Sequence, residues 1–398
     1  MKPDRKEIIN LARISHAQQV KWRRHFHKYP EISNNEFKTT DFINSILKKH
    51  KIRIIPLKGM KTGTAAIVQG KAGKGKTAAV RTDIDALPVK ELNKVSFRSR
   101  HDGVMHACGH DVHMAVVLGT AVQLSRLKDT FAGDVKFIFQ PSEEMPPGGA
   151  IEMIKAGILN KPEVNMIFGL HVDPTLPTGQ FSILDGPTMA SVIDFNITVT
   201  GQTGHAAVPH KAVDAIATAA EMIDSLQKVV SREVNPIETA VITFGAISGG
   251  SARNVIAGKV ELKGTARTLS AKTRKLLPRL IKRTVDGVCR ARGAKGVVDF
   301  IASYPVLSNH SSANKVLRRN MSGLFGRQTV KETPQVMGSE DFARYIEIVP
   351  GAMFRLGIKN TKLGSDKSWH SPSFMVDEEA ILYGTAVMMA SVLDFIAE

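Results

Sequence analysis

Residues 77–85 read Thr-Ala-Ala-Val-Arg-Thr-Asp-Ile-Asp, a short apolar strand followed at once by two carboxylates. Around it, short apolar strands alternate with helical stretches through the first half of the chain, the pattern of an α/β domain. In open α/β sheets, ligands bind outside the carboxyl ends of the strands, so polar residues there predict a functional site. The predicted strands are 64–68, 77–81, 135–140 and 164–170, the helices are 110–127 and 149–159, and the polar residues beyond the strands are Asp83, Asp85, Glu143, Glu144 and His171.

One helix start is predicted from a local motif. Ser33-Asn-Asn-Glu36 has the Ser-x-x-Glu pattern of a capping box and precedes an amphipathic run. In such a box the serine and the glutamate each bond a free backbone N–H of the first helical turn. We therefore expect Ser33 and Glu36 to cap a helix that begins near residue 37.

A different pattern begins near residue 190. Residues 192–200 alternate apolar and polar side chains, as a half-exposed antiparallel strand does. The order strand, helix, two strands, helix, strand that follows is that of a split, ferredoxin-like sandwich. Pro278 lies inside the second of these helices and is expected to kink or break it. The α/β pattern returns after Tyr304, so a small domain is inserted into a larger one. The predicted elements after 192–200 are a helix at 212–232, strands at 239–247 and 255–268, a helix at 271–291 and a strand at 297–303.

Composition excludes several classes of protein. The chain has 398 residues, of which 43% are hydrophobic and 23% charged, close to the average for globular proteins of two or three domains. No apolar run approaches the roughly 20 residues of a membrane helix, and the N-terminus lacks the apolar core of a signal peptide. Cys108 and Cys289 are too few for a disulfide framework. We expect a cytoplasmic protein with no membrane association.

The charge balance is strongly basic. Lys and Arg number 54 and Asp and Glu 37, which gives a formal net charge of +17. A nucleic-acid binder is one interpretation. However, the basic residues are scattered, and aromatic residues, which stack on bases, make up only 6% of the chain. We expect no nucleic-acid partner and interpret the charge as a solvated surface that attracts small anions.

The densest cluster of reactive residues is His106-Ala-Cys108-Gly-His110-Asp-Val-His113. A thiolate and an imidazole two residues apart suit a shared zinc-like ion, although a buried thiol beside histidines is an equal alternative. Glu143 and Glu144 follow a predicted strand, where one carboxylate can bind a metal ion and the other can act as a general base. Taken alone, that pair is more often an ordinary charged turn. His171 and His370 are equally ambiguous by themselves.

Considered together, these residues predict a metal centre. Five ligands, one of them bridging, fit a site with two ions about 3.5–4 Å apart that act on one water molecule. Glu143 is the carboxylate left over, so it is the expected general base. The five candidate ligands are Cys108, His110, Glu144, His171 and His370.

At this point the sequence resembles the aminoacylase and carboxypeptidase-like dimetal amidohydrolases. The nearest branch includes hippurate hydrolases, auxin–amino-acid conjugate hydrolases and N-acetyl-diaminopimelate deacetylases. The resemblance covers almost the whole chain, and its motifs follow the order of the family. They are Arg23-Arg24, His27, Pro30-Glu31 and Glu36, Arg81-Thr-Asp-Ile-Asp-Ala-Leu-Pro88, Met105-His-Ala-Cys-Gly-His-Asp111, Phe139-Gln-Pro-Ser-Glu-Glu144, Phe168-Gly-Leu-His171, Gly204-His205-Ala-Ala-Val-Pro-His210, Ala252-Arg-Asn-Val-Ile256, Gly264-Thr-Ala-Arg267, Met337-Gly-Ser-Glu-Asp-Phe342 and His370-Ser-Pro-Ser-Phe374.

The resemblance implies a role for each matching residue. Cys108 resembles the bridging ligand, and the other four candidates resemble terminal ligands. Asp85 resembles a carboxylate that orients a histidine ligand. His205 resembles a residue that reaches the active site of a neighbouring subunit. Asn254 and Arg267 resemble groups that hold the free carboxylate of the substrate, for which a bidentate arginine is well suited.

The implied fold is an α/β catalytic domain with a mixed central sheet flanked by helices, at 1–188 and 304–398. An inserted ferredoxin-like α+β lid and dimerisation domain occupies 189–303. The implied protein is a homodimer whose subunits each bind two divalent ions, of zinc, manganese, nickel or cobalt. It hydrolyses the amide bond of N-acyl or N-aroyl amino acids, with a metal-bound water as nucleophile and Glu143 as general base.

Three alternatives stay open. One alternative is a dipeptidase or carboxypeptidase-type hydrolase of the same family. Another is a basic binding protein of this fold that has lost catalysis. Cys108 can instead be a nucleophile, with His106 or His110 as its base. Three departures from the family pattern put the substrate in doubt, because they fall on predicted substrate and lid loops. These are Thr203 in place of a glycine, Ala257-Gly258 in place of Pro-Asp, and Met145-Pro-Pro147 in a stretch that is usually glycine-rich.

Overall fold

The computed structural model describes residues 3–301, 304–332 and 334–397. The chain divides into two compact units. Unit 1 consists of Met1–Gly186, Ser308–Pro334 and Asp341–Glu398, and unit 2 of Pro187–Leu307 and Gln335–Glu340. The domain bounds given above stay a prediction, to which this clustering adds that 335–340 groups with unit 2.

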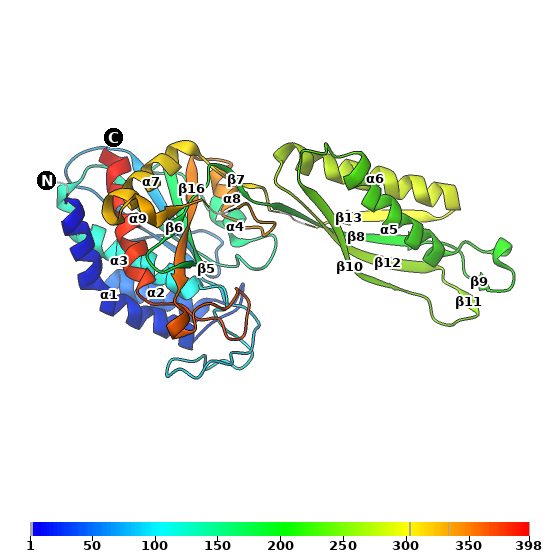
Figure 1. Cartoon of the computed structure of the whole chain (residues 1–398), viewed down its shortest axis with the longest axis horizontal. Helices are drawn as coiled ribbons and strands as arrows, with labels where there is room; N and C mark the ends of the chain where they lie inside the picture. Colours follow the sequence, from blue (N-terminus) through cyan, green and yellow to red (C-terminus); the bar gives the residue numbers. More distant parts are fainter. Residues whose placement is uncertain (1–2, 302–303, 333, 398) are drawn as a thin grey trace. The chain divides into compact units, whose positions relative to one another are not determined.

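Unit 1 contains both helices and strands along its whole length, and unit 2 has two long helices and a sheet of its own (Figure 1). The helices are α1 (Arg5–Lys28), α2 (Phe37–Lys49), α3 (His110–Arg126), α4 (Gly149–Lys155), α5 (Ala215–Arg232), α6 (Ala271–Arg292), α7 (Ser311–Phe325), α8 (Ala343–Ile346) and α9 (Ala380–Ala397). The strands are β1 (Arg53–Ile55), β2 (Thr64–Gln69), β3 (Thr77–Asp83), β4 (Asp134–Gln140), β5 (Met166–Pro177), β6 (Phe181–Ser182), β7 (Gly186–Met189), β8 (Ser191–Thr200), β9 (Gly204–His205), β10 (Ala240–Gly249), β11 (Val255–Ile256), β12 (Lys259–Thr268), β13 (Lys295–Phe300), β14 (Leu307–Asn309), β15 (Val330–Lys331) and β16 (Gly351–Lys359).

Unit 1 is built on one mixed sheet. Its strand order is β1-β2-β4-β3-β5-β16-β6-β15. The central strands β4, β3, β5 and β16 run parallel, whereas β2 and β6 run antiparallel to their central neighbours. Helices α1, α3 and α9 lie together on one side of this sheet, and α4 and α8 lie on the other (Figure 1). The predicted α/β fold with a mixed central sheet is confirmed.

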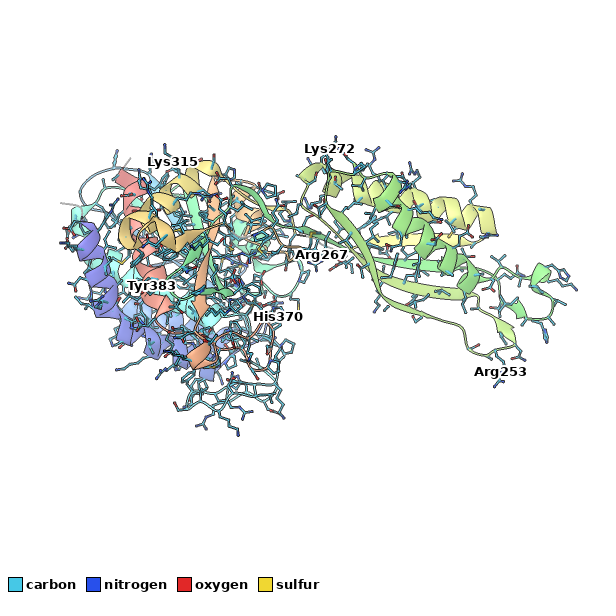
Figure 2. All side chains as sticks on the ribbon, viewed as in Figure 1. Arg253, Arg267, Lys272, Lys315, His370 and Tyr383 are labelled. Atoms are coloured by element: carbon cyan, nitrogen blue, oxygen red, sulfur yellow. The ribbon has the colours of Figure 1, made fainter. Side chains whose placement is uncertain are left out.

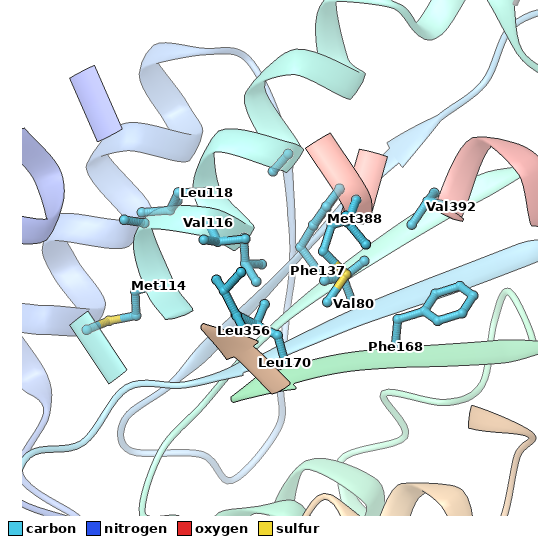
Figure 3. Close-up of a cluster of buried hydrophobic side chains, with 14 of the residues drawn as sticks. Val80, Met114, Val116, Leu118, Phe137, Phe168, Leu170, Leu356, Met388 and Val392 are labelled. Atoms are coloured by element: carbon cyan, nitrogen blue, oxygen red, sulfur yellow. The ribbon is translucent and has the colours of Figure 1, made fainter. Parts of the chain in front are cut away.

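The core of unit 1 forms between the sheet and two apolar helices. Figure 3 shows side chains of the central strands facing side chains of α3 and α9. Helix α9 is long and apolar enough to cross a membrane, but 83% of it is buried inside the protein, as in a core helix. Burying both faces of parallel strands explains their continuous apolar runs. The labelled residues are Val80, Phe137, Phe168, Leu170 and Leu356 from the strands, with Met114, Val116, Leu118, Met388 and Val392 from the helices.

The predicted capping box at the start of α2 is wrong. The helix does begin at Phe37, but the Glu31 carboxylate accepts from the backbone N–H groups of Lys38 and Thr39, at 3.2 and 2.8 Å. Ser33 and Glu36 are buried and make other hydrogen bonds. Tertiary contacts therefore replace the local cap that the motif predicts.

Unit 2 has the order β-α-β-β-α-β, and its antiparallel sheet has the strand order β10-β12-β8-β13. This is the predicted ferredoxin-like arrangement. Helices α5 and α6 start at side-chain caps, from Asp214 and Ser270, and α6 ends at Gly293 in the left-handed conformation. The apolar faces of both helices pack on the sheet. Helix α6 continues past Pro278 to Arg292, so the predicted break is wrong, whereas the alternative of a kink stays a prediction.

The predicted strand 255–268 is interrupted at Ala257-Gly258. Residues before the break form β11, which pairs with β9, and residues after it form β12 of the main sheet. A Cβ atom on Gly258 would lie 2.4 Å from Oγ1 of Thr203. Two of the departures from the family pattern are therefore neighbours, and a side chain at residue 258 would force the Thr203 hydroxyl to move.

Candidate metal centre

The candidate site lies beyond the ends of β3 and β4 in unit 1, beside the neighbouring strand β5. In the sheet register, Asp83 at the end of β3 pairs with Gln140 at the end of β4, and Arg81 pairs with Gly169 of β5. Asp85 and Glu143 therefore follow directly beyond neighbouring strand ends. His171 does not follow its strand as predicted, because β5 continues to Pro177 beside β16. The side chain still lies level with the end of β3.

A tight turn delivers the two residues of the Cys-Gly-His motif. Gly109 has φ +85° and precedes the first turn of α3. A Cβ atom there would lie 2.4 Å from Cγ2 of Val172, so both conformation and space require glycine. Cys108 thus ends the preceding loop, and His110 begins the helix.

The candidate ligand atoms converge in three overlapping groups. Cys108, His110 and His171 form the first, Cys108, Glu144 and His370 the second, and His110, Glu143 and Glu144 the third. Within each group all ligand atoms lie within 4.8 Å of one another. Cys108, His110 and Glu144 each belong to two of these groups, so the groups share ligand atoms. The five predicted ligands and Glu143 are thus brought together. The groups draw on Cys108, His110, Glu143, Glu144, His171 and His370.

Hydrogen bonds orient two of the imidazoles for metal binding. Nδ1 of His110 donates to the backbone carbonyl of Asp85 at 2.8 Å, and Nδ1 of His171 donates to that of Val172 at 2.8 Å. Nε2 of each ring is left to face the cluster, and Nε2 of His171 lies 3.5 Å from Sγ of Cys108. Among the described residues, Nε2 of His110 is buried without a hydrogen-bond partner. A buried polar atom of this kind fits a metal ligand.

Asp85 is connected to both sides of the site. Its carboxylate accepts from the Ser33 hydroxyl at 2.7 Å and from the Glu144 backbone N–H at 3.0 Å. It lies 3.4 Å from Nδ1 of His110, whose closer partner is the Asp85 carbonyl. Burial opposes ionisation, but the bonds from His110 and Ser33 keep the pKa of Asp85 below its usual value.

The electrostatics of the site favour a cation. Burial and the neighbouring carboxylates of Glu144 and Glu143 raise the pKa of the Cys108 thiol well above its usual value. Burial alone lowers the pKa of His110, but Asp83, Asp85 and Glu144 raise it to about 10. A thiol in this setting ionises only beside a cation, which fits a metal ligand better than a free nucleophile.

His113 and Asp83 also support the site, although the sequence motifs predicted no specific role for either. Nδ1 of His113 donates to Asp83 at 2.7 Å, and its Nε2 accepts from the Val172 backbone N–H at 2.9 Å. This pair connects α3 and β3 to the strand that carries His171. The spacing of His110 and His113, three residues apart on one helix, was the available signal, because such residues share a face.

The Arg23 and His27 motif of α1 also supports the loop beneath the site. Nε of Arg23 and Nδ1 of His27 each lie 2.8 Å from Oδ2 of the buried Asp111, which follows His110. Nε2 of His27 lies 3.1 Å from Glu91. The buried Asp111 carboxylate is thus paired with both Arg23 and His27, which fixes the start of α3.

The other predicted site residues lie in unit 2. His205 on β9 and Asn254 are exposed and adjacent, because β9 pairs with β11 and the Ala206 N–H donates to the Asn254 carbonyl at 3.1 Å. Arg267 lies at the other end of β12 and donates to the Met337 carbonyl at 2.8 Å. Figure 2 shows Arg253, the neighbour of Asn254, and Arg267 at opposite ends of this unit. Asn254 and Arg267 are therefore not neighbours in one chain.

Comparison with known proteins agrees with this geometry. Residues 79–394 match the peptidase family M20/M25/M40. The chain is 38% identical over 366 residues to the N-acetylcysteine deacetylase of Bacillus subtilis (strain 168), over 92% of this chain and 93% of that protein. It is 36% identical over 367 residues to Thermostable carboxypeptidase 2 of Saccharolobus solfataricus, over 92% of each.

A solved structure is similar along the whole length. The YXEP protein of Bacillus subtilis, described as a dinuclear metal binding peptidase of the M20 family, superposes with a TM-score of 0.84 at 33% identity. The superposition covers 97% of this chain and 99% of that one. Because the family match spans most of the chain and the relatives align over nearly their full length, the chain belongs to peptidase family M20/M25/M40.

Proposed function

We propose that this chain hydrolyses the amide bond of N-acyl or N-aroyl amino acids with Glu143 as general base. Its class, a metal-dependent amidohydrolase, follows from the family. The observation that carries the proposal is a cluster of a thiol, imidazoles and two adjacent carboxylates beyond the ends of β3 and β4. In each of the overlapping groups of this cluster, the ligand atoms lie within 4.8 Å of one another. The proposed ligands of two divalent ions, of zinc, manganese, nickel or cobalt, are Cys108, His110, Glu144, His171 and His370.

The proposed steps assign one task to each group of the chain. Bound metal ions supply Lewis acidity, which lowers the pKa of a water molecule and polarises the substrate carbonyl. Glu143 takes the proton of the attacking water and later gives it to the departing amine, so the products are a carboxylic acid and a free amino acid. His205 donates a hydrogen bond to the developing oxyanion.

The tautomer of His205 suits that task. Its Nδ1 accepts from the Ala207 backbone N–H at 3.1 Å, so the neutral ring carries its proton on Nε2. An exposed side chain with a fixed N–H donor can hydrogen-bond an oxygen that gains charge.

The positions within unit 2 support a site shared between two chains. Along β12, Arg267 lies eight residue steps from Lys259, which is at the β11 end, a span of about 26 Å at roughly 3.3 Å per residue. The chain enters and leaves unit 2 at the Arg267 end, where Val192 pairs with Arg267 and bonds Tyr304. We propose that Arg267 serves the site of its own chain, whereas His205 and Asn254 serve that of a partner subunit.

The sheet of unit 2 offers a surface for such a homodimer. Strand β10 is an edge strand of ten residues, with Val241 and Ile247 exposed at 39% and 56%. A long edge strand with unpaired backbone groups is a template for pairing with another chain. A two-fold axis at this edge repeats the contact in both subunits.

The substrate class is tested with a panel. Metal analysis of the purified protein, combined with acetyl, benzoyl and indoleacetyl amino acids, should give two ions per chain and turnover of at least one conjugate. The name of the archaeal relative keeps a carboxypeptidase activity as the second candidate. Dipeptides and carboxypeptidase substrates in the same panel separate the two, because preference for them over all acyl conjugates contradicts the first proposal.

Removing the metal is expected to abolish activity. Dialysis against a chelator should lower kcat/KM to background, and each of the four candidate ions should then be tested for recovery. A nucleophilic Cys108 requires no metal, so full activity after chelation with verified metal loss would favour that mechanism.

Arg267 is expected to recognise the free carboxylate of the substrate. Esterifying or amidating that carboxylate should lower kcat/KM. The corresponding activation free energy should rise by about 2–5 kcal/mol, the cost of leaving a buried charge without its partner. In the Arg267→Ala variant the free and blocked substrates should react at similar rates. Arg279, exposed on α6, is the matched control, because Arg279→Ala removes the same charge elsewhere. Equal rates for both substrates in the unmodified enzyme would remove Arg267 from the site.

A further inference from the structure

The backbone is left-handed immediately before the two active-site glutamates. Ser142 has φ +54°, and Glu143 and Glu144 follow it in the turn after β4. Side chains other than glycine pay for this conformation, and it persists only where the surroundings enforce it. Five described non-glycine residues have positive φ, and three of them, Asn34, Ser142 and His370, belong to the site or contact it. The conformation of Ser142 therefore needs a cause.

The hydrogen bonds of Ser142 come from the segment before α2. Its backbone N–H donates to Oε1 of Glu36 at 2.8 Å, and its hydroxyl lies 3.3 Å from the same oxygen. The Asn34 backbone N–H donates to the Ser142 hydroxyl at 2.8 Å. Glu36 is fully buried, so contacts with the protein and not with water fix the position of its carboxylate. These contacts hold the amide and the side chain of Ser142 from one side.

Capping of α2 does not account for Glu36. Glu31 accepts from the backbone N–H groups of the first turn, and its oxygen Oε2 also accepts from the Thr39 hydroxyl at 2.9 Å. Ser33 is likewise turned away from the helix, toward the Asp85 carboxylate that holds the Glu144 N–H. Asn34 and Glu36 thus bond the turn that carries the glutamates, and Ser33 bonds it through Asp85.

We propose that Glu36 is a positioning residue for the hydrolytic site: it holds Ser142 in the left-handed conformation and so sets the directions of Glu143 and Glu144. The role in hydrolysis rests on the proposed function. The role toward the metal ligand Glu144 does not, since it concerns geometry and metal affinity alone.

The test is a rescue by glycine. Glu36→Ala should lower kcat by roughly 5- to 30-fold, the range to which the energy of a left-handed non-glycine residue converts, with KM changed much less. Glu36→Gln keeps an acceptor oxygen and should retain most of the activity. Adding Ser142→Gly to Glu36→Ala should restore a large part of kcat, because glycine adopts positive φ without strain.

A second measurement is independent of turnover. Titration of the metal-free variants with Mn²⁺ should show weaker binding in Glu36→Ala and recovery in the double variant, because Glu144 moves with Ser142. If the unmodified enzyme hydrolyses no acyl amino acid, the proposed function fails, while the Mn²⁺ titration still decides the role of Glu36.

Glu31→Ala is the matched control. It removes a carboxylate from the same segment and should lower the Tm by weakening α2, but Ser142→Gly should not reverse its effects. Unchanged kcat and Mn²⁺ affinity in a folded Glu36→Ala variant would overturn the proposal. So would equal recovery of the Glu31→Ala and Glu36→Ala variants by the glycine, since that recovery would be non-specific. If Glu36→Ala does not fold, Glu36→Leu, which also removes the acceptor oxygen but fills more of the buried space, takes its place in the Mn²⁺ titration, with and without Ser142→Gly.

Discussion

Replacing Glu143 by alanine is expected to lower kcat by about 100- to 10,000-fold, the usual contribution of a general base, while two metal ions stay bound. The Glu143 side chain is buried, and its carboxylate lies within 4.8 Å of the ligand atoms of His110 and Glu144. It is therefore close enough to act on a water molecule there. The proposed ligand set is complete without it. Loss of the base should therefore affect proton transfer and leave metal affinity nearly intact.

Two neighbouring variants make this prediction specific. Glu144→Ala should lower metal content as well as turnover, because Glu144 is a proposed ligand. Glu152→Ala should change neither, since Glu152 is exposed on α4 and pairs with Lys155. Metal analysis and kcat are measured on the same preparations. A metal-free Glu143→Ala protein would show that Glu143 is a ligand, and a fully loaded, active one would show that it is not the base.

The parts of the fold that depend on local pattern could be predicted from the sequence. Strands β2, β3 and β4 and helix α3 agree with their predicted ranges to within two residues, because apolar runs specify them. The order of elements in the inserted unit was sufficient for its topology. The candidate ligands could be gathered because parallel strands end at one edge of a sheet, and the register places β3 and β4 level there.

The failures share a physical cause, which is competition from distant partners. Ser33 and Glu36 match a capping box, yet the buried polar groups Asp85 and Ser142 lie close enough to take their hydrogen bonds. Nothing near Ser142 in sequence shows that its φ is positive, since the contacts come from residues about 106 positions earlier. Strand β5 extends past His171 because β16, from the end of the chain, pairs with its second half. Helix α6 continues through Pro278 because its apolar face packs in the core of unit 2.

A site shared between subunits makes a second prediction with a large effect. His205→Ala alone should lose most activity, because the proposed donor to the oxyanion is removed, a loss of about 100- to 1,000-fold. Glu143→Ala is inactive for a separate reason and carries an intact His205. If the two variants exchange subunits, a mixed dimer contains one site with Glu143 from one chain and His205 from the other. Activity should then reappear, at about one quarter of the unmodified level after random exchange.

The matched control pairs two variants of unit 1. Glu143→Ala mixed with His110→Ala should recover nothing, because each site of that mixed dimer lacks a residue of its own chain. Native mass spectrometry of the two mixtures verifies that subunits have exchanged. Exchange without recovery would mean that His205 serves its own chain, and full activity of His205→Ala alone would leave it no catalytic role. Recovery confined to the first mixture assigns His205 to the partner's site, which is what its place on β9, at the end of unit 2 opposite Arg267, leads us to expect.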